Sequence, residues 1–272
     1  MIAAAADETG RIIKRERAPT PKGPEAGLAL LDEMIAEVTE GAEIIAMGAA
    51  AGGPLNWETG VVSPLHQPGW QDIPLKALMQ GKYGCRFSVD VDTNLAALAE
   101  YDHGKVSKLL YMTISTGLGG SLVVDGQIYR GMNGEHPELG HQSVPYRLAA
   151  GRTVACTCGS NGCLEALVSG SGIRRLYRKA PEELSKEEWD EVSWNLGQGL
   201  RNLAAIYLPD VIVLGGGLVF GARDSLLPPA IAVMRDHVKI VPHPKVTASD
   251  MGEHNVLAGA ILLALRDARF SS

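Results

Sequence analysis

The sequence has no apolar run of the length that a membrane-spanning helix needs, about 20 residues. Its longest candidate, Val256–Leu265, is far shorter, and residues 1–10 lack the basic start and long apolar core of a secretion signal. Basic residues are outnumbered, with 25 Lys and Arg against 31 Asp and Glu, so the net charge is −6. Nucleic acids and anionic membranes favour a basic face. We therefore expect neither as a partner, and we expect a cytoplasmic protein.

Cysteine is also scarce, with 4 in 272 residues, yet three of the four lie close together. Cys156, Cys158 and Cys163 come after His141 and have glycines among them, which indicates a bent loop rather than a helix face. Thiolate and imidazole are the ligands that tetrahedral zinc prefers, and four of them close a structural site. A disulfide is disfavoured, because Cys156 and Cys158 are too close in the chain and nothing else indicates secretion. The segment predicts structural zinc; the alternative is three unrelated thiols in a loop.

Aromatic residues make up only 5% of the chain, whereas glycine is abundant at 32 residues. Many glycines indicate tight turns and close backbone approaches, which are common where phosphates are bound. Predicted strands alternate with predicted helices and the length allows two domains, so we expect an α/β protein. Three elements are predicted in detail: a short buried strand over 42–47 that ends at Gly48, a buried strand over 211–214, and a helix over 228–238 with its prolines in the first turn.

Two glycine-rich segments follow predicted strands. Ser115–Ser121 lies between two strands, and Gly215–Gly217 lies between a strand and a helix. Backbone N–H groups in such turns can bind phosphates. The alternatives are a glycine-rich hairpin for the first and a tight β–α turn for the second. A third segment, Gly52–Pro54, is either a plain loop or a place where the backbone approaches a ligand.

Three carboxylates stand beside these features. Asp92 lies where a predicted strand gives way to a helix, and a carboxylate at such a strand end can act as a general base on a hydroxyl. The alternative is a helix N-cap. Glu138 and Glu165 flank the expected metal ligands, so a bound metal would fix both. Fixed acceptors suit sugar hydroxyls, and the alternative is a pair of solvated loop charges.

Together these segments resemble the ROK family of sugar kinases and regulators over nearly the whole chain. The resemblance rests on the sequences HPELGHQ, CTCGSNGCLE, DVDTNLAALAE, STGLGGSLVVDG and VIVLGGG. It implies an α/β, actin-like (ribonuclease H-like) fold of two domains with central mixed sheets and an active-site cleft between them. One implied domain is 1–92, completed by a C-terminal helix over 253–272. The other is 93–252, which carries the zinc site.

The resemblance also implies a reaction, the transfer of the γ-phosphate of ATP to a hexose hydroxyl with Mg²⁺ on the phosphates. Asp92 would take the proton from the attacking hydroxyl, and zinc would be structural. A homodimer or homotetramer is implied as well. The implied sugar-binding residues are Glu138, His141, Glu165, Gly53 and His66, the implied nucleotide-binding residues are Thr116, Gly117, Gly119, Gly215, Gly216 and Gly217, and the implied zinc ligands are His141, Cys156, Cys158 and Cys163.

The chain departs from the family pattern at three places. It begins after the point where the family has a first strand and a DxGGT loop for the ATP phosphates, so both are expected to be missing. Val91 and His66 each stand where the family commonly has an Asn that contacts the sugar. A non-catalytic ROK protein that binds sugar is therefore the alternative to a kinase.

Two further functions are disfavoured. A ROK repressor carries an N-terminal helix-turn-helix domain, for which no segment is expected here. A zinc hydrolase needs an open metal position, whereas three thiolates and one imidazole fill the tetrahedron.

Overall fold

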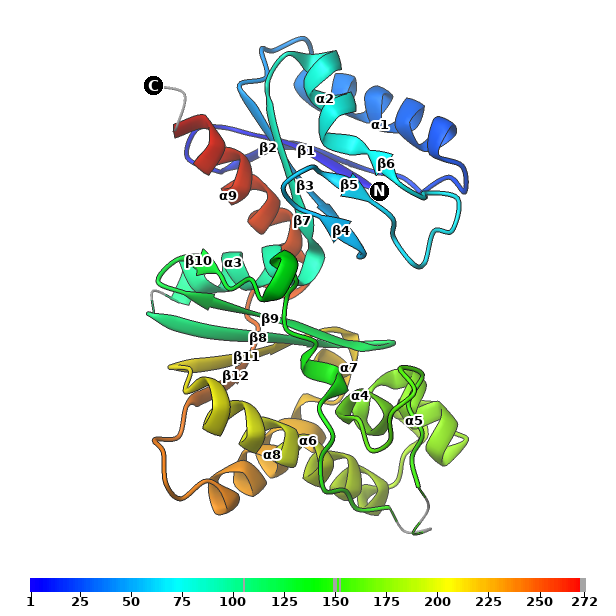
Figure 1. Cartoon of the computed structure of the whole chain (residues 1–272), viewed down its shortest axis with the longest axis vertical. Coiled ribbons are helices and arrows are strands. Elements are labelled where there is room, and N and C mark those ends of the chain that lie inside the picture. The colour runs from blue at the N-terminus through cyan, green and yellow to red at the C-terminus, as the bar shows by residue number, and fades with distance from the viewer. Residues whose placement is uncertain (105, 149–150, 152, 270–272) are drawn as a thin grey trace. The chain divides into compact units, whose positions relative to one another are not determined.

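The computed structural model describes residues 1–104, 106–148, 151 and 153–269 (Figure 1). The chain divides into two compact units. The first unit comprises Met1–Ala99 and the C-terminal residues from Val256, and the second comprises Glu100–Asn255. Among the described residues, no helix is both long and apolar enough to cross a membrane.

The first unit contains two strand pairs and a small three-stranded sheet. A hairpin opens this unit, since β1 (Ile2–Ala6) pairs antiparallel with β2 (Ile12–Arg17). β3 (Ala46–Ala51) pairs in parallel with β7 (Arg86–Val91), so both strands end at the same edge. The other elements of this unit are α1 (Pro24–Thr39), β4 (Leu55–Asn56), β5 (Val61–Val62), β6 (Ile73–Pro74), α2 (Leu75–Tyr83), most of α3 (Asp92–Gly104) and nearly all of α9 (Asn255–Arg269).

The position of β3 corrects a prediction. The strand expected over 42–47 instead begins at Ala46 and runs through Gly48. Gly48 thus lies inside the strand, and its role is to face α9. A Cβ at this position would overlap the carbonyl oxygen of Ala260, so the glycine lets the helix approach the strand.

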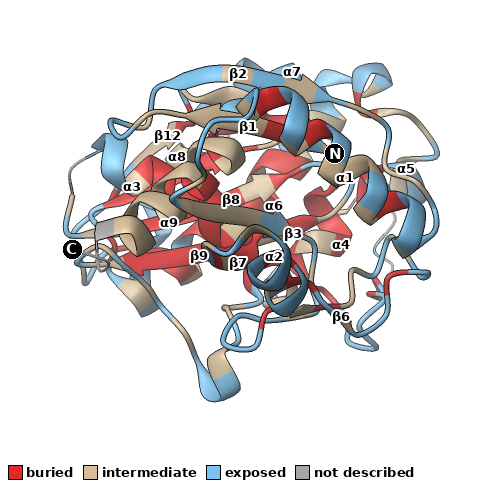
Figure 2. Ribbon diagram, turned by 90° about the horizontal axis from the view of Figure 1, so that it is seen from above, coloured by how far each residue is buried: buried red, intermediate tan, exposed pale blue. Residues whose placement is uncertain are grey.

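The second unit is built on one mixed five-stranded sheet, in the order β10-β9-β8-β11-β12. β8 pairs antiparallel with β9 on one side and parallel with β11 on the other. β9 is coloured as buried over most of its length (Figure 2), and the sheet supplies much of the core of this unit. The strands are β8 (Lys108–Ile114), β9 (Leu118–Val124), β10 (Gln127–Ile128), β11 (Val211–Gly215) and β12 (Lys245–Ala248), and the α-helices are α4 (Leu164–Val168), α5 (Gly170–Tyr177), α6 (Lys186–Tyr207), α7 (Gly217–Gly221) and α8 (Arg223–His237).

The prolines of α8 lie in the helix interior, which corrects a second prediction. The helix begins at Arg223, so Pro228 and Pro229 are not in its first turn. A proline lacks the N–H that would bond the carbonyl four residues earlier, which for Pro229 is the carbonyl of Ser225. That carbonyl accepts a hydrogen bond from the Ser193 hydroxyl of α6 at 2.9 Å instead. A side chain of the neighbouring helix thus replaces the lost backbone bond.

The two ends of the second unit are joined by buried hydrogen bonds. Glu100 is its first residue and Asn255 its last, and both are buried. Oε1 of Glu100 accepts from the Asn255 amide at 3.3 Å and from the Ser249 hydroxyl. The same amide donates to Oη of Tyr111 at 3.0 Å. These bonds satisfy a carboxylate that would be costly to bury alone.

Candidate active site

The four expected zinc ligands converge in the second unit. One nitrogen or sulfur atom from each of His141, Cys156, Cys158 and Cys163 lies within 4.8 Å of the others. Nδ1 of His141 is 3.6 Å from Sγ of Cys156, and Sγ of Cys158 is 3.6 Å from Sγ of Cys163. A tetrahedral zinc, about 2.3 Å from sulfur and about 2.0 Å from nitrogen, has edges of roughly 3.5–3.8 Å. The four side chains are therefore compatible with structural zinc.

The pKa values of two cysteines in this cluster are shifted in opposite directions. Burial, followed by the neighbouring thiols of Cys158 and Cys156, raises the pKa of Cys163 to about 12. A hydrogen bond from the backbone of Ser160, followed by one with Cys156, lowers the pKa of the exposed Cys158. A thiolate at Cys163 thus needs a positive charge beside it, and a bound metal supplies one.

A tight backbone turn brings the cysteines together. The N–H of Cys156 donates to the carbonyl of Ser160 at 2.8 Å. Gly159 lies within the turn with φ of +91°, a conformation that residues with a Cβ rarely adopt. An isolated β-bridge between Ser143 and Cys163 brings the segment after the histidine alongside the last cysteine. The expectation of a bent loop around these ligands is confirmed.

Glu165 links this metal-ligand segment to the first glycine-rich turn. It lies in the first turn of α4, two residues after Cys163. Its Oε2 accepts a hydrogen bond from the N–H of Leu118 at 2.9 Å. A Cβ on Gly117 would stand 3.0 Å from the same oxygen. The carboxylate expected to bind sugar therefore also holds the backbone of the turn.

The first glycine-rich turn is shorter than the sequence indicates. Only Ser115–Gly117 lies outside the strands, because Gly119 is already part of β9 and pairs with Thr113 of β8. The longer loop predicted here is wrong. Gly120 shows why the segment is rich in glycine: a Cβ there would stand 2.5 Å from the carbonyl oxygen of Tyr111. Some of these glycines therefore serve close packing within the hairpin, whose strand arrangement was the alternative reading.

The second glycine segment lies beside the first. Gly215 ends β11 and pairs with Thr113, so the carboxyl ends of β11 and β8 are adjacent. Gly216 has φ of +96°, and a Cβ there would overlap the carbonyl oxygen of Ile114. Gly217 opens α7. Both segments predicted to bind nucleotide thus lie at one edge of the sheet, where α/β proteins bind ligands.

The remaining acidic residue of this region is more exposed. The side chain of Glu138 is 64% exposed. A 3₁₀ turn follows it over Leu139–His141, and a Cβ on Gly140 would stand 3.3 Å from Cβ of Glu165. The segment that carries Glu138 therefore packs against α4 beside the other glutamate.

In the first unit, Asp92 lies where β7 ends and α3 begins. β3 and β7 end together, with Ala51 opposite Val91. Asp92 is the first residue of α3 and is exposed. Its Oδ1 accepts from the N–H of Thr93 at 2.7 Å. A carboxylate in this first turn is favoured by the partial positive charge of the helix N-terminus.

Gly53 and His66 belong to the same strand edge. A Cβ on Gly53, which follows β3, would stand 3.7 Å from Cγ1 of Val91. The carbonyl of Gly53 accepts from the N–H of Leu65 at 3.0 Å, and exposed His66 comes next in the chain. The first unit thus brings Gly53, the His66 loop and Asp92 to the carboxyl ends of β3 and β7.

The buried carboxylate of Asp90 is not among the residues predicted from the sequence. This side chain is 2% exposed and lies two residues before Asp92. Its Oδ1 accepts from the N–H of Val91 and from the amide of Asn94, both at 2.8 Å. These bonds tie the end of β7 to the first turn of α3. The four-residue spacing of Asp90 and Asn94 across the predicted junction is the signal that indicates such a contact.

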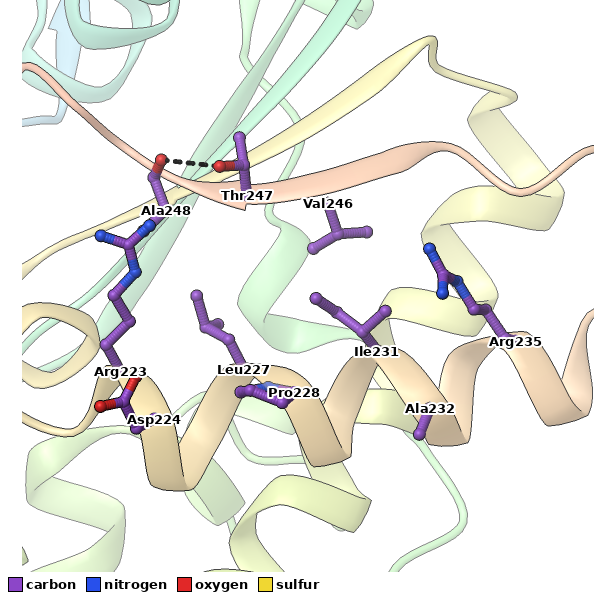
Figure 3. A pocket seen from close by; sticks show the side chains of 10 residues that line it. All are labelled: Arg223, Asp224, Leu227, Pro228, Ile231, Ala232, Arg235, Val246, Thr247 and Ala248. Atoms are coloured by element: carbon purple, nitrogen blue, oxygen red, sulfur yellow. Dashed lines mark hydrogen bonds between the residues drawn. The ribbon is translucent and has the colours of Figure 1, made fainter.

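A separate cavity of about 430 Å³ lies between α8 and β12. Figure 3 shows Leu227 and Ile231 of α8 facing Val246 of β12, with Arg223 and Arg235 towards opposite ends. None of the site residues predicted from the sequence lines this cavity. The predicted polar groups lie elsewhere, at the metal cluster and glycine turns of the second unit and at the strand ends of the first.

The match to known proteins covers these same segments. The model of the ROK family matches residues 1–267. The chain belongs to the ROK family. The glucokinase of Halalkalibacterium halodurans is 29% identical to it, over 87% of this chain and 81% of its own. A xylose repressor of Caldicellulosiruptor bescii is 26% identical, over 82% of this chain and 63% of its own.

Solved structures of ROK proteins share the fold. The ROK hexokinase of Thermus thermophilus superposes with a TM-score of 0.84 at 30% identity, over 96% of this chain and 93% of its own. A ROK glucokinase of Streptomyces griseus, solved in complex with glucose and AMPPNP, gives 0.76 at 26% identity, over 97% and 96%. The expected actin-like (ribonuclease H-like) α/β fold is confirmed.

Proposed function

We propose that this ROK protein is a carbohydrate kinase that transfers the γ-phosphate of ATP to a hydroxyl of a hexose. The observation that carries the proposal is the contact of Glu165 with the turn Ser115–Gly117. A carboxylate that can accept from a sugar hydroxyl is thereby fixed to a turn whose N–H groups can bind a phosphate. Relatives named glucokinase, and a ROK glucokinase solved with glucose and AMPPNP, support the same reaction.

In this proposal Asp92 is the general base. Its exposed carboxylate at the start of α3 can accept the proton of the attacking hydroxyl. Asp90 and Asn94 hold the strand–helix junction that presents it. Phosphoryl transfer depends mostly on positioning and charge neutralisation, and Mg²⁺ supplies neutralisation when bound to the phosphates.

We also assign a structural zinc to the cluster of His141 and the three cysteines. The convergence of the four ligand atoms and the two separations of 3.6 Å within the cluster support the assignment. Nδ1 of His141 faces Cys156, which leaves Nε2 on the other side of the ring for a sugar hydroxyl. Zinc would fix the segments that carry Glu138 and Glu165, the two proposed acceptors for the sugar.

Sugar-dependent ATP consumption tests the proposal. ADP release is measured with Mg²⁺ and glucose, fructose, mannose or an N-acetyl hexosamine, against a sugar-free control. We expect release with at least one hexose to exceed the control many-fold. Calorimetric binding of a sugar without ADP release from any of them would refute the kinase proposal.

A sugar-binding ROK protein without kinase activity is the second candidate, and Val91 favours it. This side chain is 5% exposed, packs beside Gly53 and offers no hydrogen bond to a sugar. Losing one such bond costs about 1 kcal/mol or more. A mobility shift with operator DNA would instead indicate a regulator, the function named for the related xylose repressor.

A further inference from the structure

The turn Ser115–Gly117 is held by the start of α5. The carbonyl of Ser115 accepts from the N–H of Gly170 at 2.8 Å. The carbonyl of Thr116 accepts twice from Ser171, from its N–H at 3.0 Å and from its hydroxyl at 2.7 Å. A Cβ on Gly170 would stand 2.9 Å from the Ser115 carbonyl oxygen, so the two segments are in close contact.

Two hydroxyls in series fix the donor and the acceptor in the hydrogen bond between Ser171 and the carbonyl of Thr116. Oγ of buried Ser169 caps α5 by accepting from the N–H of Gly172 at 3.1 Å. The O–H of Ser169 can then donate a hydrogen bond to Oγ of Ser171, 3.2 Å away. Oγ of Ser171 thus accepts a hydrogen bond from Ser169, and its own O–H donates to the carbonyl of Thr116. Such linked hydrogen bonds polarise one another and favour a single orientation.

Because the peptide bond is planar, these contacts also determine where the N–H groups of Ser115–Gly117 point. In a trans peptide the C=O of one residue and the N–H of the next point in opposite directions. Because the carbonyls of Ser115 and Thr116 point at α5, the N–H groups of Thr116 and Gly117 point away from it. The N–H groups of Thr116 and Gly117 therefore face the same way, as in an anion-binding nest. The next N–H, that of Leu118, donates to Glu165 instead.

We propose that the Ser171 hydroxyl is a positioning residue for the ATP phosphates. It keeps the carbonyl of Thr116 turned towards α5 and so keeps the N–H of Gly117 directed at the phosphate. A carbonyl rotated the other way would present a negative dipole to the phosphate. This inference rests on the proposed kinase function and adds a residue of α5 that acts through the backbone of the turn.

The substitution Ser171→Ala isolates the hydroxyl. The N–H of residue 171 still donates to Thr116, so the turn remains anchored while its orientation is less restricted. Ser171→Thr restores the hydroxyl and should restore function. Ser193→Ala is the matched control, since it removes a hydroxyl that also donates to a carbonyl, that of Ser225 between α6 and α8.

Binding of Mg–ATP without sugar is measured by calorimetry, and KM is measured separately for ATP and for the hexose. We expect Ser171→Ala to weaken ATP binding about three- to tenfold, to raise KM for ATP equally and to leave KM for the hexose unchanged. Ser171→Thr and Ser193→Ala should bind ATP as the unaltered protein does. Normal ATP binding by Ser171→Ala would overturn the inference alone. Absence of ATP binding by the unaltered protein would overturn it together with the kinase function.

Discussion

The two units hold their proposed site residues in different ways. In the second unit, Glu165, the turn Ser115–Gly117 and the metal-ligand segment are joined by hydrogen bonds and by a tight ligand cluster. In the first unit, Asp92 and His66 are exposed side chains at strand ends. The proposed binding residues of the second unit are thus held together by hydrogen bonds to the backbone. The proposed proton transfer in the first unit depends on one carboxylate, that of Asp92.

Substitutions in the two units should therefore affect different properties of the protein. A change at Asp92 should alter the chemical step and leave binding intact. A change in the metal cluster should disturb Glu165 and the turn Ser115–Gly117 together, because Glu165 follows the last ligand and bonds to the turn.

The largest effect is expected for Asp92→Asn. The amide keeps the shape of the side chain but cannot accept the proton, so kcat should fall about 10²- to 10⁴-fold. Calorimetric affinity for the sugar should change little. Asp224→Asn is the control, because Asp224 is also an exposed carboxylate in the first turn of a helix, α8. Equal losses in both variants would assign Asp92 a helix-charge role instead.

A large effect on stability is expected for Cys158→Ser. This side chain is exposed, so the substitution removes a ligand without leaving a buried cavity. Bound zinc measured by elemental analysis should fall from about one per chain to near zero, and Tm should drop on the order of 10 °C, since about 1 kcal/mol corresponds to 2–4 °C at this size.

Cys85→Ser provides the matched comparison, because Cys85 lies in the first unit outside the cluster. Its zinc content and Tm should match those of the unaltered protein. Retention of zinc by Cys158→Ser would contradict the metal assignment.

The smallest effect concerns packing in the first unit. Gly48→Ala would force a methyl group against the Ala260 carbonyl of α9 and should destabilise the protein by about 1–3 kcal/mol in a thermal melt. Gly81→Ala in α2 has no atom within 4 Å of the new methyl and should stabilise by up to about 1 kcal/mol. If both variants changed the free energy of unfolding in the same direction, α9 would have moved to accommodate the new methyl group at residue 48.

The metal cluster and the strand–helix alternation could be predicted because their signals are local. Three cysteines and a histidine at short spacing restrict the chemistry whatever surrounds them. The capping box of Ser185 and Glu188 at the start of α6 likewise acts within one turn, so its signal is also local.

The errors share one physical cause. In the sequence, Gly48, Gly119 and Pro228 each indicate a local turn or a helix start. In the structure, a contact with α9 explains Gly48, strand pairing with β8 explains Gly119, and Pro228 lies inside a longer helix. The hydrogen bond from Leu118 to Glu165 spans 47 residues, so no short pattern in the sequence contains it. The assembly of the candidate site could therefore be found only from the folded backbone.

The buried bond between Glu100 and Asn255 has a consequence for how the protein is made. The second unit is one continuous segment inserted into the first, and its two ends meet at this bond. During synthesis, the ribosome completes the whole second unit before α9 emerges. The core of the first unit needs α9, since Ala260 packs with Leu95 and Leu98. The unit whose chain starts first is therefore the last that can finish folding, which reverses the usual N-terminal-first order.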